Sequence, residues 1–450
     1  MASIHKCLTR RQFLRASAVA GVGAFITACA PPVAVPVPSV GEVAAPAPVT
    51  APVTIRFLTQ GGAQVAFDRY EPLIAKFQEA NSGVTVDPIW EPGGAIEVQT
   101  KLLTLIAAGE APDVYWAHTY TNAGQAKRNI QMDLQPMIDA DPSVSGENFL
   151  AGAWADFNVA GKQIGIPRET TSTVLIYNKQ LFEQNGLPLP TEDWTWSDFL
   201  TAAKAITTGE GAEKIYGTAD WNLNRNTWIK MWQKGGDVLN EDRTKFIMNE
   251  EPSVSQVQEI ADWHHELQIH IPGVEKGGFS TGDLFTTGRI GMFPQFSVFD
   301  NVMPAEFEWD IAHLPMDSGD QRTTRVASAG HSMYSGTKNL DAAWKWMAYL
   351  ASEEAFWHWV STGLKVPSLR VVAEDPKFLD PSQPPAHAQI MLDAFAYGRP
   401  EPVAGDWIGV HREIQPALDA IYGVEKAPVK PTLDAIADRV NELIAYVPGV

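Results

Sequence analysis

Apolar and polar residues alternate with two different periods from residue 53 onward. Residues 53–57 alternate with a period of two, which is typical of a strand with one buried face. Apolar residues between positions 70 and 77 recur three and four positions apart, which places them on one face of a helix. An extended pattern returns at residues 84–86. The sequence therefore predicts a strand, a helix and a second strand in succession.

The same alternation continues along the chain. A helical pattern over residues 98–107 precedes an apolar run at 113–116, and extended segments follow at 161–167 and 172–178. Such alternation predicts an α/β fold with parallel strands, whose ligands meet the loops at the carboxyl ends of the strands. A second α/β lobe is predicted to start near residue 169. Later elements are predicted as a helix opened by a capping box at Thr195–Asp198, strands at 289–293 and 309–315, and helices at 341–350 and 432–446.

The amino-terminal segment has the pattern of an export signal. Four basic residues and no acidic ones precede residue 16, and an uncharged stretch of modest hydrophobicity then leads to Cys29. The basic part, with Arg10 and Arg11, resembles the twin-arginine export signal, and Ile26-Thr-Ala-Cys29 resembles a bacterial lipobox. We predict that residues 1–28 are a twin-arginine lipoprotein signal peptide and that Cys29 is lipidated. A plain secretory signal with an incidental cysteine is the alternative.

The stretch after Cys29 is unsuited to a packed core. Residues 30–52 contain seven prolines among alanine and valine, with Glu42 as the single charge. Such a segment favours extended conformations, so residues 29–52 are predicted to be a lipidated tether. The sequence holds only two cysteines, Cys7 and Cys29, and Cys7 would leave with the signal peptide. We therefore expect an exported protein, lipid-anchored at the outer face of the bacterial cytoplasmic membrane, without disulfides.

Composition and charge narrow the function. The chain has 450 residues, of which 45% are apolar, enough for one or two large lobes. Its 34 lysines and arginines against 53 acidic residues give a net charge of −19, which repels phosphate backbones and argues against nucleic acid as a partner. Fifteen tryptophans are an excess that suits either a packed core or flat platforms for a ligand.

Several segments between Thr54 and Ile444 stand in a recognisable order and spacing. The segments are Leu73-Ile-Ala-Lys-Phe77 with Asn81-Ser-Gly83, Ala111-Pro-Asp113, Gly161-Lys-Gln-Ile-Gly-Ile-Pro167, Ile176-Tyr-Asn-Lys179, Thr195-Trp-Ser-Asp-Phe199, Gly288-Arg-Ile-Gly-Met292, Leu314-Pro315, and Lys338-Asn339 before Ala342-Ala-Trp344. Together they resemble one known family, the family 1 extracellular solute-binding proteins of ABC importers, which are the maltodextrin-binding-like class.

The resemblance implies a two-lobe periplasmic-binding-protein fold of type II, with a hinge that the chain crosses three times. Lobe one would hold residues 53–168 and 309–351, and lobe two residues 169–308 and 352–450. The lobes would close on a small-molecule ligand, expected to be a carbohydrate, and a permease of an ABC importer would be the partner. The resemblance implies a monomeric binding protein without a cofactor or metal, and not an enzyme.

A sugar site needs aromatic plates and planar polar groups in a largely dry cleft. Trp116 and Tyr120 follow a predicted strand of lobe one, while Trp221 and Trp407 lie in polar sequence of lobe two. Each could instead be a core residue, as is expected of Trp263, Trp344, Trp346, Trp357 and Trp359 in helical patterns. The polar candidates, which could equally be structural loop residues, are Gln60, Arg168, Glu169, Gln295 and His331.

Two other functions stay open on the sequence. An exported glycoside hydrolase could use carboxylates such as Glu169 and Asp406, and a surface adhesion or scaffolding lipoprotein would explain the tether without a ligand. Motifs of catalysis are weak. The segment 330–334 lacks the last glycine of a nucleophile elbow. His264, His265 and His270 lack the spacing of a metal site and are predicted to lie on a solvated helix face.

Overall fold

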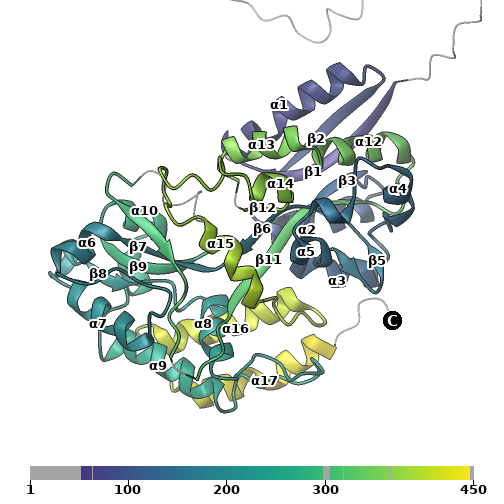
Figure 1. Cartoon of the computed structure of the whole chain (residues 1–450). Helices are drawn as coiled ribbons and strands as arrows, with labels where there is room; N and C mark the ends of the chain where they lie inside the picture. Colours follow the sequence, from purple (N-terminus) through teal and green to yellow (C-terminus); the bar gives the residue numbers. More distant parts are fainter. Residues whose placement is uncertain (1–51, 63, 297–304, 318, 365, 446–450) are drawn as a thin grey trace, which may run out of the picture. The chain divides into compact units, whose positions relative to one another are not determined.

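The computed structural model describes residues 52–445 apart from residues 63, 297–304, 318 and 365 (Figure 1). From Ala51 onward the chain forms one compact unit. The predicted signal peptide, Arg10, Arg11, Cys29 and nearly all of the tether lie outside the described residues. Within the described part, every helix is too short or too polar to cross a lipid bilayer.

The larger sheet has the strand order β12-β6-β11-β3-β1-β2, with β13 paired to β11. Strands β1 (Val53–Gly61) and β2 (Val84–Pro92) are parallel, and α1 (Gln64–Ala80) connects them, so the predicted strand, helix and strand are confirmed. Strand β3 (Val114–His118) is parallel to β1 on its other side and follows α2 (Ala95–Ala107). The carboxyl ends of these strands therefore meet at one edge.

Further strands, each antiparallel to its neighbour, extend the larger sheet beyond β3. Strand β11 (Thr324–Met333) runs antiparallel both to β3 and to β6 (Ile166–Ser172), with an irregularity between Ala329 and Gly330. A side chain added to Gly330 would meet the Ile166 carbonyl oxygen at 2.1 Å, so only glycine fits where β11 approaches β6 this closely. Periodicity alone predicted parallel strands and did not anticipate this return.

The second sheet has the order β10-β7-β9-β8. Strand β7 (Val174–Asn178) is antiparallel to both β9 (Ile290–Gln295) and β10 (Trp309–Ala312), whereas β8 (Tyr216–Thr218) is parallel to β9. Only Thr173 separates β6 from β7, so the chain passes from the larger to the smaller sheet there. It returns between β10 and β11. The predicted lobe boundaries stay a prediction, although β10, which they place in lobe one, pairs with β7 in the smaller sheet.

Two large apolar clusters pack against the sheets. In one, α1, α12 (Leu340–Leu350) and α13 (Glu353–Ser361) cover the larger sheet. In the other, α7 (Trp196–Ile206), α8 (Asn224–Gln233), α9 (Ser253–His265), α16 (Trp407–Tyr422) and α17 (Val429–Ala445) pack together (Figure 1). As predicted for core tryptophans, Trp263, Trp346 and Trp359 are fully buried, while Trp344 and Trp357 are partly buried against the first cluster.

The helix start at Thr195 shows how local chemistry sets an element boundary. The Thr195 hydroxyl accepts a hydrogen bond from the Asp198 amide, and the Asp198 carboxylate accepts one from the Thr195 amide at 3.0 Å, which confirms the predicted capping box. The remaining elements are α3 (Thr119–Lys127), α4 (Gln135–Ala140), η2 (Gly146–Asn148), α5 (Ala151–Ala155), β4 (Asn158–Val159), β5 (Lys162–Gln163), α6 (Lys179–Gln184), η3 (Gly211–Glu213), η4 (Gly273–Lys276), α10 (Thr281–Thr286), β12 (Val366–Pro367), α14 (Arg370–Ala373), α15 (Gln389–Asp393), η5 (Ala394–Tyr397) and β13 (Gly398–Arg399).

Candidate ligand-binding site

Three adjacent cavities meet at Tyr120, which lines all of them. Their volumes are about 380, 370 and 590 Å³. The first and second also share Ile96 and Arg225, and the second and third share Ile408 and Arg412. We call the three cavities together the cleft. Its lining residues come from β1, β3, β6, α2 and α3 on one side and from α8, α16 and α17 on the other.

Tyr120 is positioned by the turn from β3 into α3. The Thr121 hydroxyl donates a hydrogen bond to the His118 carbonyl at 2.8 Å, which tightens this helix start. The rings of His118 and Tyr120 lie 4.0 Å apart between centroids. Tyr120 also packs against the apolar cluster of α16 and α17 and against a smaller apolar cluster that contains Tyr115 and Trp116 of β3. Because β1 and β3 are parallel neighbours, Tyr120 lies beyond the same sheet edge as Gln60, as the rule for strand ends predicts.

The 380 Å³ cavity gathers four of the predicted residues: Gln60, Trp116, Tyr120 and Glu169. Trp116 is 5% exposed, and its indole N–H is buried without a hydrogen-bond partner. The Gln60 amide donates to the Gly93 carbonyl at 3.3 Å. Sequence separates these positions widely, and the sheet brings them into one cavity. Their contact with a ligand stays a prediction.

Arg168 and His331 lie beneath the cavity rather than in its wall. The Arg168 guanidinium pairs with the Glu169 carboxylate at 2.9 Å and also bonds the Tyr70 hydroxyl. That hydroxyl lies 2.9 Å from the His331 Nε2 atom. Burial, together with the Arg168 charge, holds the pKa of His331 well below its ordinary range, so this ring is neutral. The network holds Glu169 in place, which makes Arg168 and His331 positioning residues.

Trp221 does not reach the cleft. It is fully buried, with ring centroids 5.1 Å from Trp196 and 5.8 Å from Trp263, and its indole N–H donates to Thr218. The sequence suggested a polar loop because Asp220 precedes it. The Asp220 carboxylate instead accepts internal hydrogen bonds, including one from the Thr281 hydroxyl at 2.7 Å. The polar neighbours are thus paired with each other, and we remove Trp221 from the proposed site.

Trp407 and Gln295 lie at the margins of the cleft. Trp407 lines the 590 Å³ cavity but is 2% exposed, because its ring packs beside Trp228 and its indole N–H donates to Glu401 at 2.9 Å. Gln295 ends β9, and its side-chain oxygen accepts from the Phe296 amide at 2.8 Å. Phe296 itself lines the 380 Å³ cavity. Gln295 therefore lies next to the cavity without lining it, whereas Phe296 lines it.

A buried ionic group that the sequence did not suggest lies between the cavities. Arg325 on β11 donates through Nε to the Glu401 carboxylate at 2.6 Å, and both side chains are less than 5% exposed. Glu401 also accepts from Trp407 and lies 3.0 Å from His411. Although burial alone would raise the pKa of Glu401, the charge of Arg325 and the contact with His411 hold it well below its ordinary range. Glu401 is therefore ionised.

The lining of the cleft is balanced in charge, unlike the whole chain at −19. Acidic residues do not dominate there, so the cleft does not share the repulsion of anions that the net charge predicts for the surface. The charged lining residues are five arginines, Arg128, Arg225, Arg325, Arg412 and Arg439, and five carboxylates, Glu97, Glu169, Glu401, Asp406 and Glu442.

Asp156 lies near the cleft, behind β11. Its carboxylate accepts a hydrogen bond from the Ser328 hydroxyl at 2.6 Å, and Ser328 stands between the lining residues Ala327 and Ala329 on that strand. Because side chains alternate along a strand, Ser328 points away from the cavity. Burial raises the pKa of Asp156 to about 6.

A fourth cavity of about 760 Å³ lies beside α9 and α16, and no predicted ligand-binding residue lines it. The prediction that His264 and His270 lie on a solvated helix face is wrong, because they are only 8% and 1% exposed. Their rings lie 3.9 Å apart between centroids. Burial lowers the pKa of both imidazoles. Across the described part of the chain, no group of three or more His, Cys, Asp or Glu side chains is arranged to hold a metal ion.

The residues considered for catalysis have structural partners. Glu169 is paired with Arg168, and Asp406 caps α16 by accepting a hydrogen bond from the Gly409 amide at 3.1 Å. Ser332 is fully buried in β11, where its hydroxyl accepts from Gln131 at 3.3 Å. None of these arrangements favours the hydrolase alternative.

Comparison with solved structures supports the fold. The ABC substrate-binding protein Lmo0181 of Listeria monocytogenes, in complex with cycloalternan, has a TM-score of 0.78 at 23% identity, covering 88% of this chain and 100% of that one. The maltose-bound MalE3 of T. maritima has a TM-score of 0.74 at 22% identity, covering 87% and 100%. These matches confirm the predicted two-lobe fold.

Comparison of sequences identifies the family. A protein of Brucella abortus (strain 2308), named only as a binding protein, is 24% identical over 293 residues, which are 63% of this chain and 69% of that protein. The family model described as bacterial extracellular solute-binding protein matches residues 64–355. Since this match covers well over half of the 450 residues and agrees with the resemblance in the sequence, the chain belongs to the family of bacterial extracellular solute-binding proteins.

Proposed function

We propose that the chain captures a sugar or oligosaccharide in the cleft and delivers it to the membrane permease of an ABC importer. Family membership supports the role of a solute-binding protein. The observation that carries the proposal is the 380 Å³ cavity, where Trp116, Tyr120 and Phe296 meet the polar Gln60 and Glu169. Two proteins with the same fold were solved with a bound saccharide, cycloalternan in one and maltose in the other.

The chemistry of the cleft suits a polyol. A sugar ring presents C–H faces, which pack on aromatic rings, and hydroxyls, which need donors and acceptors at fixed positions. Trp116 offers an unpartnered indole N–H, and Gln60 and Glu169 offer a planar amide and a planar carboxylate. The Arg168 guanidinium holds the Glu169 carboxylate in place, because the pair is buried with an N···O distance of 2.9 Å.

Closure of two lobes is the proposed mechanism of capture. The cleft is lined from both sides, by elements of the larger sheet and by α8, α16 and α17. A ligand that contacts both walls stabilises the closed state by the difference between its contacts in the closed and open states. We propose residues 53–168 as the main part of lobe one, with the β6-to-β7 passage at Thr173 as one hinge crossing, and a monomer as the working unit.

We also propose that residues 1–28 direct export and that Cys29 carries the lipid anchor. In a bacterial host, Cys29→Ala is expected to release the protein from the membrane fraction or to leave the precursor unprocessed. Substitution of Ser39 by alanine in the same proline-rich segment is the matched control. Unchanged processing and membrane association of Cys29→Ala would contradict the anchor.

A thermal-shift screen against a set of neutral and acidic mono- and oligosaccharides tests the function. A ligand present at 100 times its Kd should stabilise the folded state by about 2.7 kcal/mol. Calorimetry on each hit and chromatography of the incubated sugar then separate the functions. Saturable binding without products supports the binding protein, turnover supports a glycoside hydrolase, and no binding across the set would contradict the proposal.

A further inference from the structure

Arg225 places a positive charge in the cleft, and its side chain is only partly exposed. It lies in the first turn of α8 and lines both the 380 and the 370 Å³ cavities. Its Nε–H group is buried and has no hydrogen-bond partner. No carboxylate of the described residues forms a salt bridge with this guanidinium. A charge withdrawn from water is costly unless an opposite charge or hydrogen bonds compensate for it.

Arg325 reinforces this positive site. The guanidinium carbons of Arg225 and Arg325 lie 5.5 and 5.4 Å from the centroid of the Phe296 ring, so both cations are held against one aromatic side chain. The Nε–H group of Arg325 donates a hydrogen bond to Glu401, but the Nη1 atom of Arg325 is buried without a hydrogen-bond partner. Both arginines line the same 380 Å³ cavity, which therefore contains unsatisfied N–H donors from two cations.

The nearby carboxylates are already engaged. Glu401 is bonded to Arg325, Trp407 and His411. Asp220 accepts from Thr281 and pairs with Lys276. Neither of these carboxylates therefore pairs with Arg225 among the residues that the structure describes.

Two other acidic residues line the 380 Å³ cavity. Glu169 is paired with Arg168 at 2.9 Å. Glu97 is exposed and is held at the start of α2, where it accepts from the Gly94 amide at 2.8 Å. Burial, and next the charge of Arg325, lowers the pKa of Arg225, which is the direction expected of a cation without a sufficient counter-charge.

We propose that the ligand of this cleft is a polyol that carries an anionic group, a carboxylate or a phosphate ester, and that Arg225 binds this group. A guanidinium presents parallel N–H donors whose spacing matches the two oxygens of a carboxylate or phosphate. Neutral hydroxyls could accept the same hydrogen bonds but would leave the charge uncompensated. The proposal rests on the proposed function and narrows its substrate class.

Calorimetry on the wild-type chain with matched pairs of ligands tests the proposal. The pairs are glucose with glucuronate, glucose with glucose 6-phosphate, and glycerol with glycerol 3-phosphate, and inorganic phosphate is added alone. We expect the anionic member of at least one pair to bind at least 100-fold more tightly than the neutral one, with an affinity that falls as salt rises. Tight binding of glucuronate would identify the anionic group as a carboxylate, and tight binding of a phosphorylated member would identify it as a phosphate ester.

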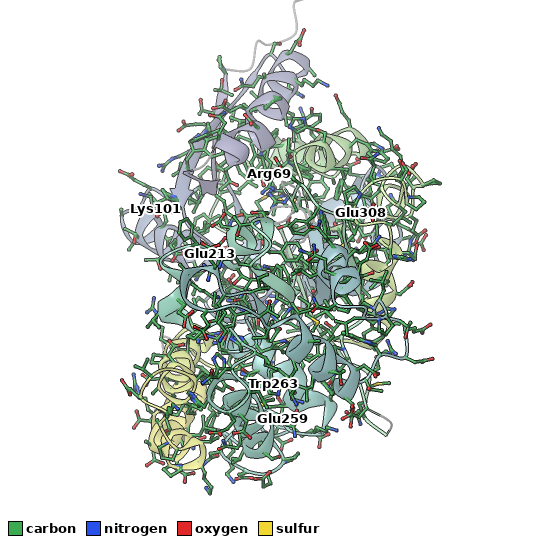
Figure 2. All side chains as sticks on the ribbon, turned by 90° about the vertical axis from the view of Figure 1, so that its left-hand side faces the viewer. Arg69, Lys101, Glu213, Glu259, Trp263 and Glu308 are labelled. Carbon is green, nitrogen blue, oxygen red and sulfur yellow. The ribbon has the colours of Figure 1, made fainter. Side chains whose placement is uncertain are left out.

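Arg225→Gln is expected to weaken binding of the anionic ligand at least 100-fold and to remove most of its salt dependence. Arg225→Lys, which keeps the charge, should retain part of the affinity. Lys101→Gln is the matched control, because it makes the same charge change on α2 without lining the cleft (Figure 2). Thermal unfolding without ligand shows whether each variant is folded.

The outcomes separate the two proposals. Binding of a neutral saccharide as tightly as its anionic counterpart, or an equal loss for both in Arg225→Gln, would overturn the anionic substrate and leave the sugar-binding function standing. Equal effects of Arg225→Gln and Lys101→Gln would also overturn it, because the charge would then act only at long range. If neither the pairs nor the wider saccharide set bind, both proposals fall.

Discussion

The molecule contains two concentrations of aromatic and charged side chains, and they differ in what their polar groups contact. Around Trp221 the rings of Trp196 and Trp263 pack edge to face, and the Lys230 ammonium lies 4.1 Å from the Trp196 centroid. Lys230 is 1% exposed and pairs with Glu259 at an N···O distance of 3.0 Å. Glu259 lies on α9, one turn before Trp263 (Figure 2). We call this group the sealed cluster.

The cleft is built from similar residue types but leaves several of their polar atoms without partners. The indole N–H of Trp116, Nε of Arg225 and Nη1 of Arg325 are all buried without a hydrogen bond. In the sealed cluster the Lys230 cation pairs with the Glu259 carboxylate, whereas in the cleft Arg225 forms no salt bridge with a described residue. The sealed cluster also contains an unpaired indole N–H, that of Trp263, so an unpaired cation distinguishes the cleft better than an unpaired indole does.

The largest expected effect separates the two regions by stability. Trp221→Ala should lower the free energy of unfolding by about 3–5 kcal/mol, because it leaves a large void in a close-packed cluster. Chemical denaturation measures the change, and Trp344→Ala, at a partly buried position, is the comparison, with a smaller expected loss. A stable Trp221→Ala variant that no longer binds sugar would restore Trp221 as a ligand plate.

The next prediction concerns a carboxyl group behind the cleft. The pKa of Asp156 is about 6 in the folded state and about 3.9 in unfolded chains, so folding favours its protonated form. Ionisation then opposes folding increasingly as pH rises from about 4 to 6, and the loss is complete above that range. Asp156→Asn should therefore stabilise the protein by about 2–3 kcal/mol at pH 7 and by almost nothing at pH 3.

Denaturant unfolding of wild type and Asp156→Asn at both pH values measures this difference. The measurement at pH 3 is an internal control, because the wild-type carboxyl is almost fully protonated there in both states. A benefit of the same size at both pH values would show that the amide acts by packing, and that the charge of Asp156 does not matter.

A smaller effect is expected at Tyr120, where the readout is binding. Tyr120→Ala should weaken ligand binding by about 1–2 kcal/mol, or roughly 5- to 30-fold, since it removes a ring that lines all three cavities. Tyr120→Phe keeps the ring and should retain most of the affinity, as calorimetry can test. Full affinity in Tyr120→Ala would exclude its ring from the binding surface.

Local periodicity was sufficient to predict that part of the candidate site lies at the ends of two neighbouring strands. Gln60, Trp116 and Tyr120 come near the ends of β1 and β3, and parallel neighbours in a sheet bring such positions together. The family resemblance added Glu169, which lies on β6 beside β11. These predictions depended on the order of strands and helices along the sequence.

The rest of the candidate site depends on contacts between elements that are distant in the sequence. Arg325 lies on β11 and Arg225 on α8, and they meet only because β11 returns antiparallel through the larger sheet to pack beside α8. Trp221 was misjudged for the same kind of reason, since the partner of Asp220, Thr281, comes from another element. A polar residue in sequence does not reveal whether its partner is water, a ligand or a distant side chain.

The most direct test is a crystal structure of the protein with the tightest ligand from the saccharide screen. The account predicts that the ligand lies in the cleft, with a ring face on Tyr120 and with polar atoms within hydrogen-bond distance of Trp116 and Arg225. A ligand in the 760 Å³ cavity beside His264 and Tyr422, with the cleft empty, would contradict it.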